Sequence, residues 1–292
     1  GNKTTFKLLT PEDAIIGNWS SQLNYSSNSF SGADDSKGVN PANGIVFYYY
    51  IPDNLKNKEL SLEIKDESGN TVRTISSKAN PNYLRYPGGP SPEPILANKV
   101  GLNRFVWDMR HPSLPGIPTA YIEGSYRGHK AMPNLYSAIL KQENKISEVS
   151  FSILPNPLYD ITKKEYVETH EFKMITEANL TDMHTRVNQL KKIQNQLIEI
   201  IKKLPEEQKY MGLKSKGETI IQQLKSWDED MVQRKSKAYD DVENFPNKFT
   251  AEYIFLMNQN DSSIPRVNSA SKNRLEELNK EWIELKNRSK EL

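Results

Sequence analysis

Proline and glycine are concentrated in the first 160 residues of this 292-residue chain, whereas charged residues are concentrated in the remainder. Residues 1–160 contain 14 of the 17 prolines and 12 of the 14 glycines, while residues 161–292 contain 45 charged residues against 31 before them. Proline and glycine mark turns between short strands, and dense charge typically covers helix surfaces. The sequence therefore predicts a multidomain α+β chain, with a β part first and an α part second.

Residues 44–158 contain short apolar segments separated by turn residues. In Leu60–Asp66 every second residue is apolar, which is typical of a strand with one face in water. Gly69 and Asn70 can form the turn that leads to a partner strand at Thr71–Ile75. The further predicted strands are Ile45–Ile51, Asn103–Met109, Leu135–Lys141 and Glu148–Leu154. This pattern predicts an antiparallel β-sandwich of the immunoglobulin or fibronectin type III kind.

Residues 1–43 are predicted to form an irregular N-terminal segment that packs on the sandwich through its apolar side chains. Their second half is rich in serine, asparagine, aspartate and glycine, which is typical of irregular chain.

Residues 159–292 are predicted to form an antiparallel bundle of three or four helices. Thr162 and Glu165 have the spacing of a capping box, which starts a helix, and Pro205 ends that helix. Between them, apolar residues recur at spacings of three and four on one helix face. Further apolar patterns predict helices around Leu224, in Phe249–Met257 and around Leu278.

Composition excludes several classes of protein. The formal net charge is only +2, from 39 basic and 37 acidic residues, which argues against a nucleic-acid partner. The absence of cysteine excludes disulfides and thiolate metal sites. The densest apolar run, Gly44–Ile51, is much shorter than the roughly 18 residues that a membrane-spanning helix needs, so no membrane span is expected.

The four histidines predict no metal site. His170 and His184 are fourteen residues apart, which is about 21 Å along one helix. His111 and His129 flank a segment that could fold back, but neither has a carboxylate at the spacing of a metal ligand. All four are therefore expected to be exposed or to lie in loops. Because the paired carboxylates lie in solvated contexts and no catalytic motif occurs, we expect no catalytic residue and no cofactor.

Loop tyrosines are the candidate site residues. A sandwich with exposed aromatic rings can stack against a sugar, and outward tyrosines can equally meet the helical part. The sequence leaves both interpretations open, a carbohydrate-binding surface or an interdomain surface. The four tyrosines are Tyr83, Tyr86, Tyr121 and Tyr126.

Several segments resemble one family. The stretches LEIKDESGNTVRTI and GLNRFVWDMRHP, at residues 62–75 and 101–112, resemble the region that follows the β-propeller in large bacterial BNR-repeat glycosyl hydrolase or sortilin-like proteins. The first stretch also resembles the immunoglobulin-like domain of the flagellar hook-capping family. GIVFYYYIP, GHKAMPNLYSAIL, LPNPLYDIT and ENFPNKFTAEYIFLMNQND extend the resemblance. The chain departs from the family pattern at Asn134, where glycine is usual, and at Asn156-Pro157-Leu158.

The resemblance implies a secreted, periplasmic or cell-surface parent protein, with a signal peptide and a β-propeller upstream of this chain. The chain is then expected to be a non-catalytic accessory region, structural or interacting, whose partner is that propeller. Two alternatives remain: a carbohydrate-binding module that uses the loop tyrosines, and part of a glycoside hydrolase whose catalytic residues lie upstream.

Overall fold

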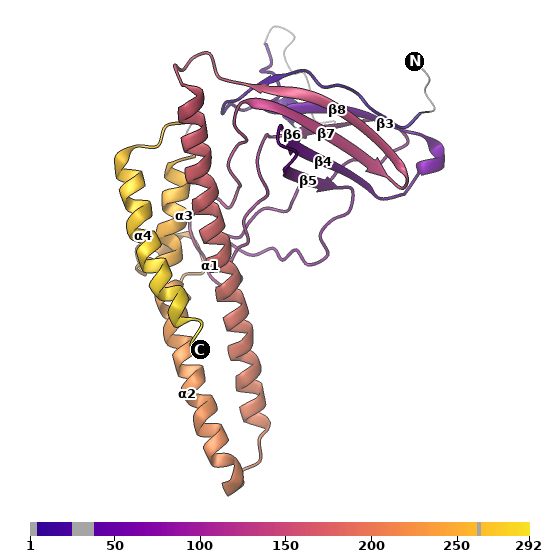
Figure 1. Cartoon of the computed structure of the whole chain (residues 1–292). Coiled ribbons are helices and arrows are strands. Elements are labelled where there is room, and N and C mark those ends of the chain that lie inside the picture. Colours follow the sequence, from indigo (N-terminus) through magenta and orange to yellow (C-terminus); the bar gives the residue numbers. More distant parts are fainter. Residues whose placement is uncertain (1–4, 25–37, 262–263) are drawn as a thin grey trace.

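The computed structural model describes residues 5–24, 38–261 and 264–292 (Figure 1). Within these residues the chain is a mixed α/β structure with two sheets and four α-helices, and the sheets precede the helices in sequence. In Figure 1 the sheets lie together at one end, and α1 runs past them and continues well beyond. The predicted order, a β part followed by an α part, is confirmed.

The smaller sheet has three antiparallel strands in the order β1-β3-β6. Its central strand is the apolar run identified in the sequence. The strands are β1 (Lys7–Leu8), β3 (Ile45–Ile51) and β6 (Gly101–Trp107).

The larger sheet has five strands in the order β2-β8-β7-β4-β5, of which only the β2–β8 pair is parallel. Gly69, at the turn between β4 and β5, has φ 83°, a conformation that glycine adopts without strain. The strands are β2 (Ala14–Ile15), β4 (Leu60–Asp66), β5 (Thr71–Ser76), β7 (Asn134–Gln142) and β8 (Lys145–Leu154).

The N-terminal segment joins both sheets. β1 pairs with β3, and β2 pairs with β8, so Lys7–Leu8 and Ala14–Ile15 are strands of the two sheets. Residues 1–4 and 25–37 of the predicted irregular segment lie outside the described residues.

The first core lies between the two sheets. Phe47 of β3 and Trp107 of β6 pack edge-on against Phe151 of β8, at ring-centroid distances of 5.5 and 6.3 Å. Each of these side chains comes from the alternating apolar face of its strand. The period-2 pattern in the sequence therefore corresponds to the faces that the sheets bury against each other.

The helices begin and end close to the predicted positions. Thr162 and Glu165 form the predicted capping box, in which the Glu165 N–H donates to Thr162 Oγ1 at 3.2 Å and the Thr162 N–H donates to the Glu165 carboxylate at 2.8 Å. The first helix ends two residues before Pro205. The helices are α1 (Lys163–Lys203), α2 (Gln208–Met231), α3 (Phe249–Gln259) and α4 (Ser269–Arg288).

A second core lies among the helices, and it includes side chains from the β part. The long connection between β6 and β7 contributes five buried residues to the core that contains Val187 of α1 and Trp227 of α2. These five are Leu114, Ile117, Ala120, Ile122 and Tyr126. The helices begin close to the predicted boundary at residue 159, but the second core extends across that boundary in sequence.

None of the helices within the described residues combines the length and the apolar character needed to cross a membrane.

Candidate functional site

The candidate site lies where the β6–β7 connection meets the start of α1. The connection folds back on itself, because the His111 N–H donates to the His129 carbonyl at 2.9 Å and Arg110 and Lys130 form a β-bridge. Gly128 permits this close approach, since a Cβ at that position would lie 2.6 Å from the His111 carbonyl oxygen. As a result the rings of His111 and His129 stack, with centroids 4.2 Å apart and planes 13° from parallel.

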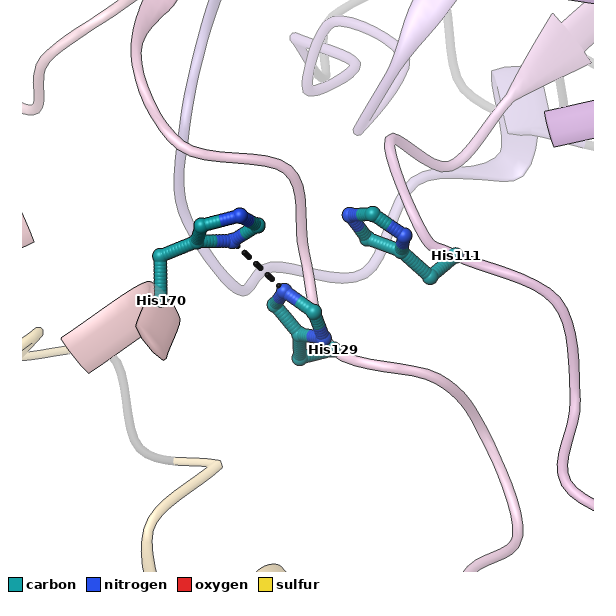
Figure 2. A group of neighbouring side chains, drawn as sticks. All are labelled: His111, His129 and His170. Carbon is teal, nitrogen blue, oxygen red and sulfur yellow. Dashed lines mark hydrogen bonds between the residues drawn. The ribbon is translucent and has the colours of Figure 1, made fainter. Parts of the chain in front are cut away.

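A third histidine joins this pair from the helical part. His170 lies near the start of α1, and its Nδ1 is 2.8 Å from Nε2 of His129, a hydrogen bond between the two rings. Figure 2 shows the three rings turned toward one another from three separate stretches of chain. One ring nitrogen from each histidine lies within 4.8 Å of the other two. We call His111, His129 and His170 the histidine cluster.

Glu177 fixes the orientation of the central ring. Its Oε1 accepts the His129 backbone N–H at 2.6 Å, and its Oε2 is 2.9 Å from His129 Nδ1. Glu177 lies two helical turns after His170 on α1 and is only 7% exposed. Because the carboxylate contacts both the backbone and the ring of His129, the Nε2 of His129 points toward His170.

Burial determines the charge of the cluster. Desolvation lowers the pKa of His111 to about 3, and it also lowers the pKa of His129 and of His170. The neighbouring imidazoles of His129 and His170 lower the pKa of His111 further, and His170 does the same for His129. Burial raises the pKa of the Glu177 carboxyl above its usual range, while the hydrogen bond from the His129 amide opposes that shift. The three imidazoles are therefore neutral at neutral pH.

Ion pairs with buried cations surround the cluster, and the pair between Arg110 and Asp261 connects the two parts of the chain. Asp261, which follows α3, lies 2.8 Å from Arg110 Nη2 and 3.7 Å from Lys173 Nζ. Arg110 also donates to the Gly128 carbonyl at 2.8 Å. Arg73 of β5 pairs with Glu93 and donates to the carbonyl of His111. Each of these three cations therefore has a carboxylate partner.

The cluster lies between a small cavity and an open cleft. His129 and His170 line the cavity, which has a volume of about 40 Å³ and is also lined by Lys173 and Asp261. This volume has room for a few water molecules. His111 lines the cleft, which has a volume of about 800 Å³ and is also bordered by Trp107. Small solutes can therefore approach the cluster from the His111 side.

The arrangement suits metal ligation better than proton transfer. Neutral imidazoles are among the commonest ligands of Zn²⁺ and related ions. Glycoside hydrolysis instead needs a carboxylic acid that is free to donate its proton and a second carboxylate nearby. Both oxygens of Glu177 contact His129, and Asp261 is paired with Arg110 and Lys173.

The four tyrosines predicted as candidate site residues do not together form one exposed surface. Tyr126 is 3% exposed, and its ring lies 5.8 Å from that of His184 in the second core. The backbone N–H of Tyr121 donates to the Ser236 carbonyl at 3.0 Å. Tyr126 and Tyr121 therefore both contact the helical part. Tyr83 donates its hydroxyl to the Pro90 carbonyl at 3.0 Å within its own loop, whereas the ring of Tyr86 packs on Gly89 and its hydroxyl end packs on Gly116 of the β6–β7 connection.

The sequence prediction for the histidines was wrong in part. His111 and His129 do lie in a loop, but His170 and His184 both lie on α1, and His184 is fully buried. His184 does lie apart from the cluster, as its separation from His170 predicted, and its Nδ1 donates to the Pro115 carbonyl at 2.6 Å. The available signal was the possible folding back of the segment between His111 and His129. Nothing in the sequence placed His170 or Glu177 against that segment.

Comparisons with family models, with curated proteins and with solved structures find no match to this chain.

Proposed function

We propose that this chain is a non-catalytic accessory region, with a structural or interaction role, of a larger exported β-propeller protein of the kind that the sequence resembles. In this proposal the two sheets form an immunoglobulin-like sandwich and the helices form an antiparallel bundle. The observation that carries the proposal is the shared second core, in which residues 114–126 of the β part pack among the helices. A core shared in this way makes the two parts one rigid unit.

Hydrogen bonds at the same junction support this rigidity. Asn188 of α1 donates to the Gly116 carbonyl at 2.9 Å, and Asn258 of α3 accepts the Ser125 backbone N–H at 2.6 Å. Together with the ion pair between Arg110 and Asp261, they connect the β6–β7 connection to α1, α3 and the segment after α3. Sliding of one part against the other would leave several of these polar groups without partners, at a cost of about 1–3 kcal/mol each where they are buried.

The hairpin of α1 and α2 is the part that we propose to contact the propeller. In Figure 1 it extends well beyond the sheets and beyond α3 and α4. Exposed apolar side chains lie along it, and these are the side chains that we propose to contact the propeller. They are Ile193, Ile200, Met211, Leu213 and Ile220.

A binding experiment tests this proposal directly. The upstream segment of the parent protein, expressed separately, is expected to bind this chain in isothermal titration calorimetry. Ile200→Glu and Met211→Glu place charge on the hairpin and are expected to weaken that binding at least about tenfold. Ile146→Glu is the matched control, because Ile146 is even more exposed, at 67% against 57% for Ile200 and 59% for Met211, and lies on β8. Absence of binding, or equal weakening by the control, would contradict the proposal.

The two alternatives are tested on the same preparation. We expect no hydrolysis of chromogenic glycosides and no retardation in affinity gels that contain polysaccharide. Retardation that Tyr83→Ala abolishes would instead assign carbohydrate binding to the loop tyrosines, and hydrolysis would assign catalysis to this chain.

A further inference from the structure

We propose that the histidine cluster binds one divalent transition-metal ion of the class that prefers imidazole ligands, with Zn²⁺ as its representative. His111, His129 and His170 are the proposed ligands. The proposal concerns a site at the junction of the two parts, and it does not depend on the accessory function proposed above.

The geometry identifies the ligand nitrogens of His129 and His170, whereas the His111 ring, which stacks nearly parallel on His129, has to rotate out of that stack to bind the same ion. Because Nδ1 of His129 is hydrogen-bonded to Glu177, its Nε2 is the free ligand atom. That atom faces Nδ1 of His170 at 2.8 Å. Zn–N bonds of about 2.0–2.1 Å in tetrahedral geometry place ligand nitrogens roughly 3.4 Å apart. The ion would therefore replace the hydrogen bond between the rings after these two atoms separate by about half an ångström.

Glu177 supplies the outer contact that histidine ligands usually have. In metal sites the second ring nitrogen of a ligating histidine almost always donates to a carboxylate, a carbonyl or water, which fixes the tautomer and the ring orientation. Glu177 Oε2 lies 2.9 Å from His129 Nδ1, and Glu177 Oε1 accepts the backbone N–H of the same residue. The central ligand is therefore oriented in advance.

The surrounding charges are compatible with a cation. Lys173 and Arg110 lie close to the cluster, but both are paired with Asp261. Arg73, which contacts the His111 carbonyl, is paired with Glu93. Because Asp261 is shared by two of these cations and Lys130 also lines the cavity, the carboxylates offset part of the repulsion that the basic side chains exert on the ion.

Access and coordination number also fit a three-histidine site. Sites with three protein ligands keep a fourth position for water or another small ligand. The cavity beside His129 and His170, about 40 Å³ in volume, can hold that water. The ion can enter from the cleft along His111.

Metal binding would join the two parts of the chain. His111 and His129 come from the β6–β7 connection, whereas His170 comes from α1. An ion that binds only the folded chain stabilises it by mass action. With free Zn²⁺ at about 100 times its Kd, we expect the Tm of the metal-free chain to rise by about 5 °C.

The test is a titration of the full, metal-free chain with Zn²⁺ alone, measured by calorimetry and by competition with a chromophoric chelator. We expect one ion per chain. His111→Asn, His129→Asn and His170→Gln are each expected to weaken binding at least about 100-fold. His184→Asn is the matched control. His184 is buried on α1, the helix that carries His170, but it lies outside the cluster. Asparagine at this position can still donate to the Pro115 carbonyl.

Glu177→Gln tests the contribution of the Glu177 contact with His129 Nδ1 without removing any of the three ligands. This variant keeps all three imidazoles, so we expect the stoichiometry to remain one and the affinity to fall about 10- to 100-fold.

If a variant fails to fold, NMR spectroscopy of the unmodified chain still identifies which histidines bind the ion. In imidazole proton–nitrogen NMR spectra, Zn²⁺ should shift the ring signals of three histidines and leave those of His184 unchanged. Absence of binding to the folded chain would overturn the proposal. Binding that leaves the three ring signals unchanged, or that the cluster substitutions do not weaken, would overturn it as well.

Discussion

At the scale of single residues, burial at the junction determines both charge and stability. His184 of α1 is fully buried, its Nδ1 donates to the Pro115 carbonyl, and desolvation lowers its pKa to about 4. In the unfolded chain the pKa returns to about 6.5. The unfolded state therefore binds a proton more readily than the folded state over this range of pH.

The first prediction concerns this titration. The contribution of His184 is fully present above pH 6.5 and is lost as the pH falls toward 4, by about 3 kcal/mol at most. In His184→Asn the free energy of unfolding should fall less steeply between these pH values. Urea denaturation at pH 7, 5.5 and 4.5 measures both slopes. His111 and His129 contribute in the same direction, so the variant keeps part of the slope. Equal slopes would contradict this account of His184.

The second prediction compares a buried ion pair with an exposed one. Arg110→Gln removes the buried guanidinium from Asp261 and from the Gly128 carbonyl, while Asp261 keeps its contact with Lys173 and is 31% exposed, so the free energy of unfolding should fall by about 1–3 kcal/mol. Arg127→Gln breaks the exposed pair with Asp108 and should cost less than about 1 kcal/mol. Denaturant unfolding of both variants gives the two values. Similar losses would show that Arg110 does not stabilise the junction as proposed.

At the scale of elements, local patterns were sufficient for most strands and helices. The alternation in Leu60–Asp66 and the capping box at Thr162 both depend on residues a few positions apart, and both are present in the structure. β1 and β2 were not predicted, because two-residue strands carry no periodicity and depend on partners far away in sequence. The packing of residues 114–126 among the helices was not predicted either, because it also depends on partners far away in sequence.

The third prediction concerns the start of α1. Thr162→Ala removes the hydroxyl that accepts the Glu165 N–H, and the free energy of unfolding should fall by about 1 kcal/mol. Lys163→Ala, one residue later and exposed, should change it by less than about 0.5 kcal/mol. Thermal unfolding followed by circular dichroism distinguishes the two. A cap variant as stable as its neighbour would contradict the role of the capping box.

At the scale of the whole molecule, the connection between β6 and β7 determines how the two parts combine. It supplies His111 and His129 to the cluster and five apolar side chains to the second core. The sequence indicated that a β part precedes an α part, because composition changes at residue 160. Which surfaces meet depends on contacts between residues far apart in sequence, such as His129 and Glu177, and these could not be predicted from local patterns.

The sheets and the helices form one unit through this connection, and Ile117→Ala tests this coupling. Ile117 belongs to the β part in sequence but is fully buried in the second core, so the substitution should cost about 2–5 kcal/mol. Hydrogen exchange followed by mass spectrometry measures β7 and α2 separately. We predict that protection falls by similar free energies in both elements. Loss of protection in α2 alone, with β7 unchanged, would contradict this coupling.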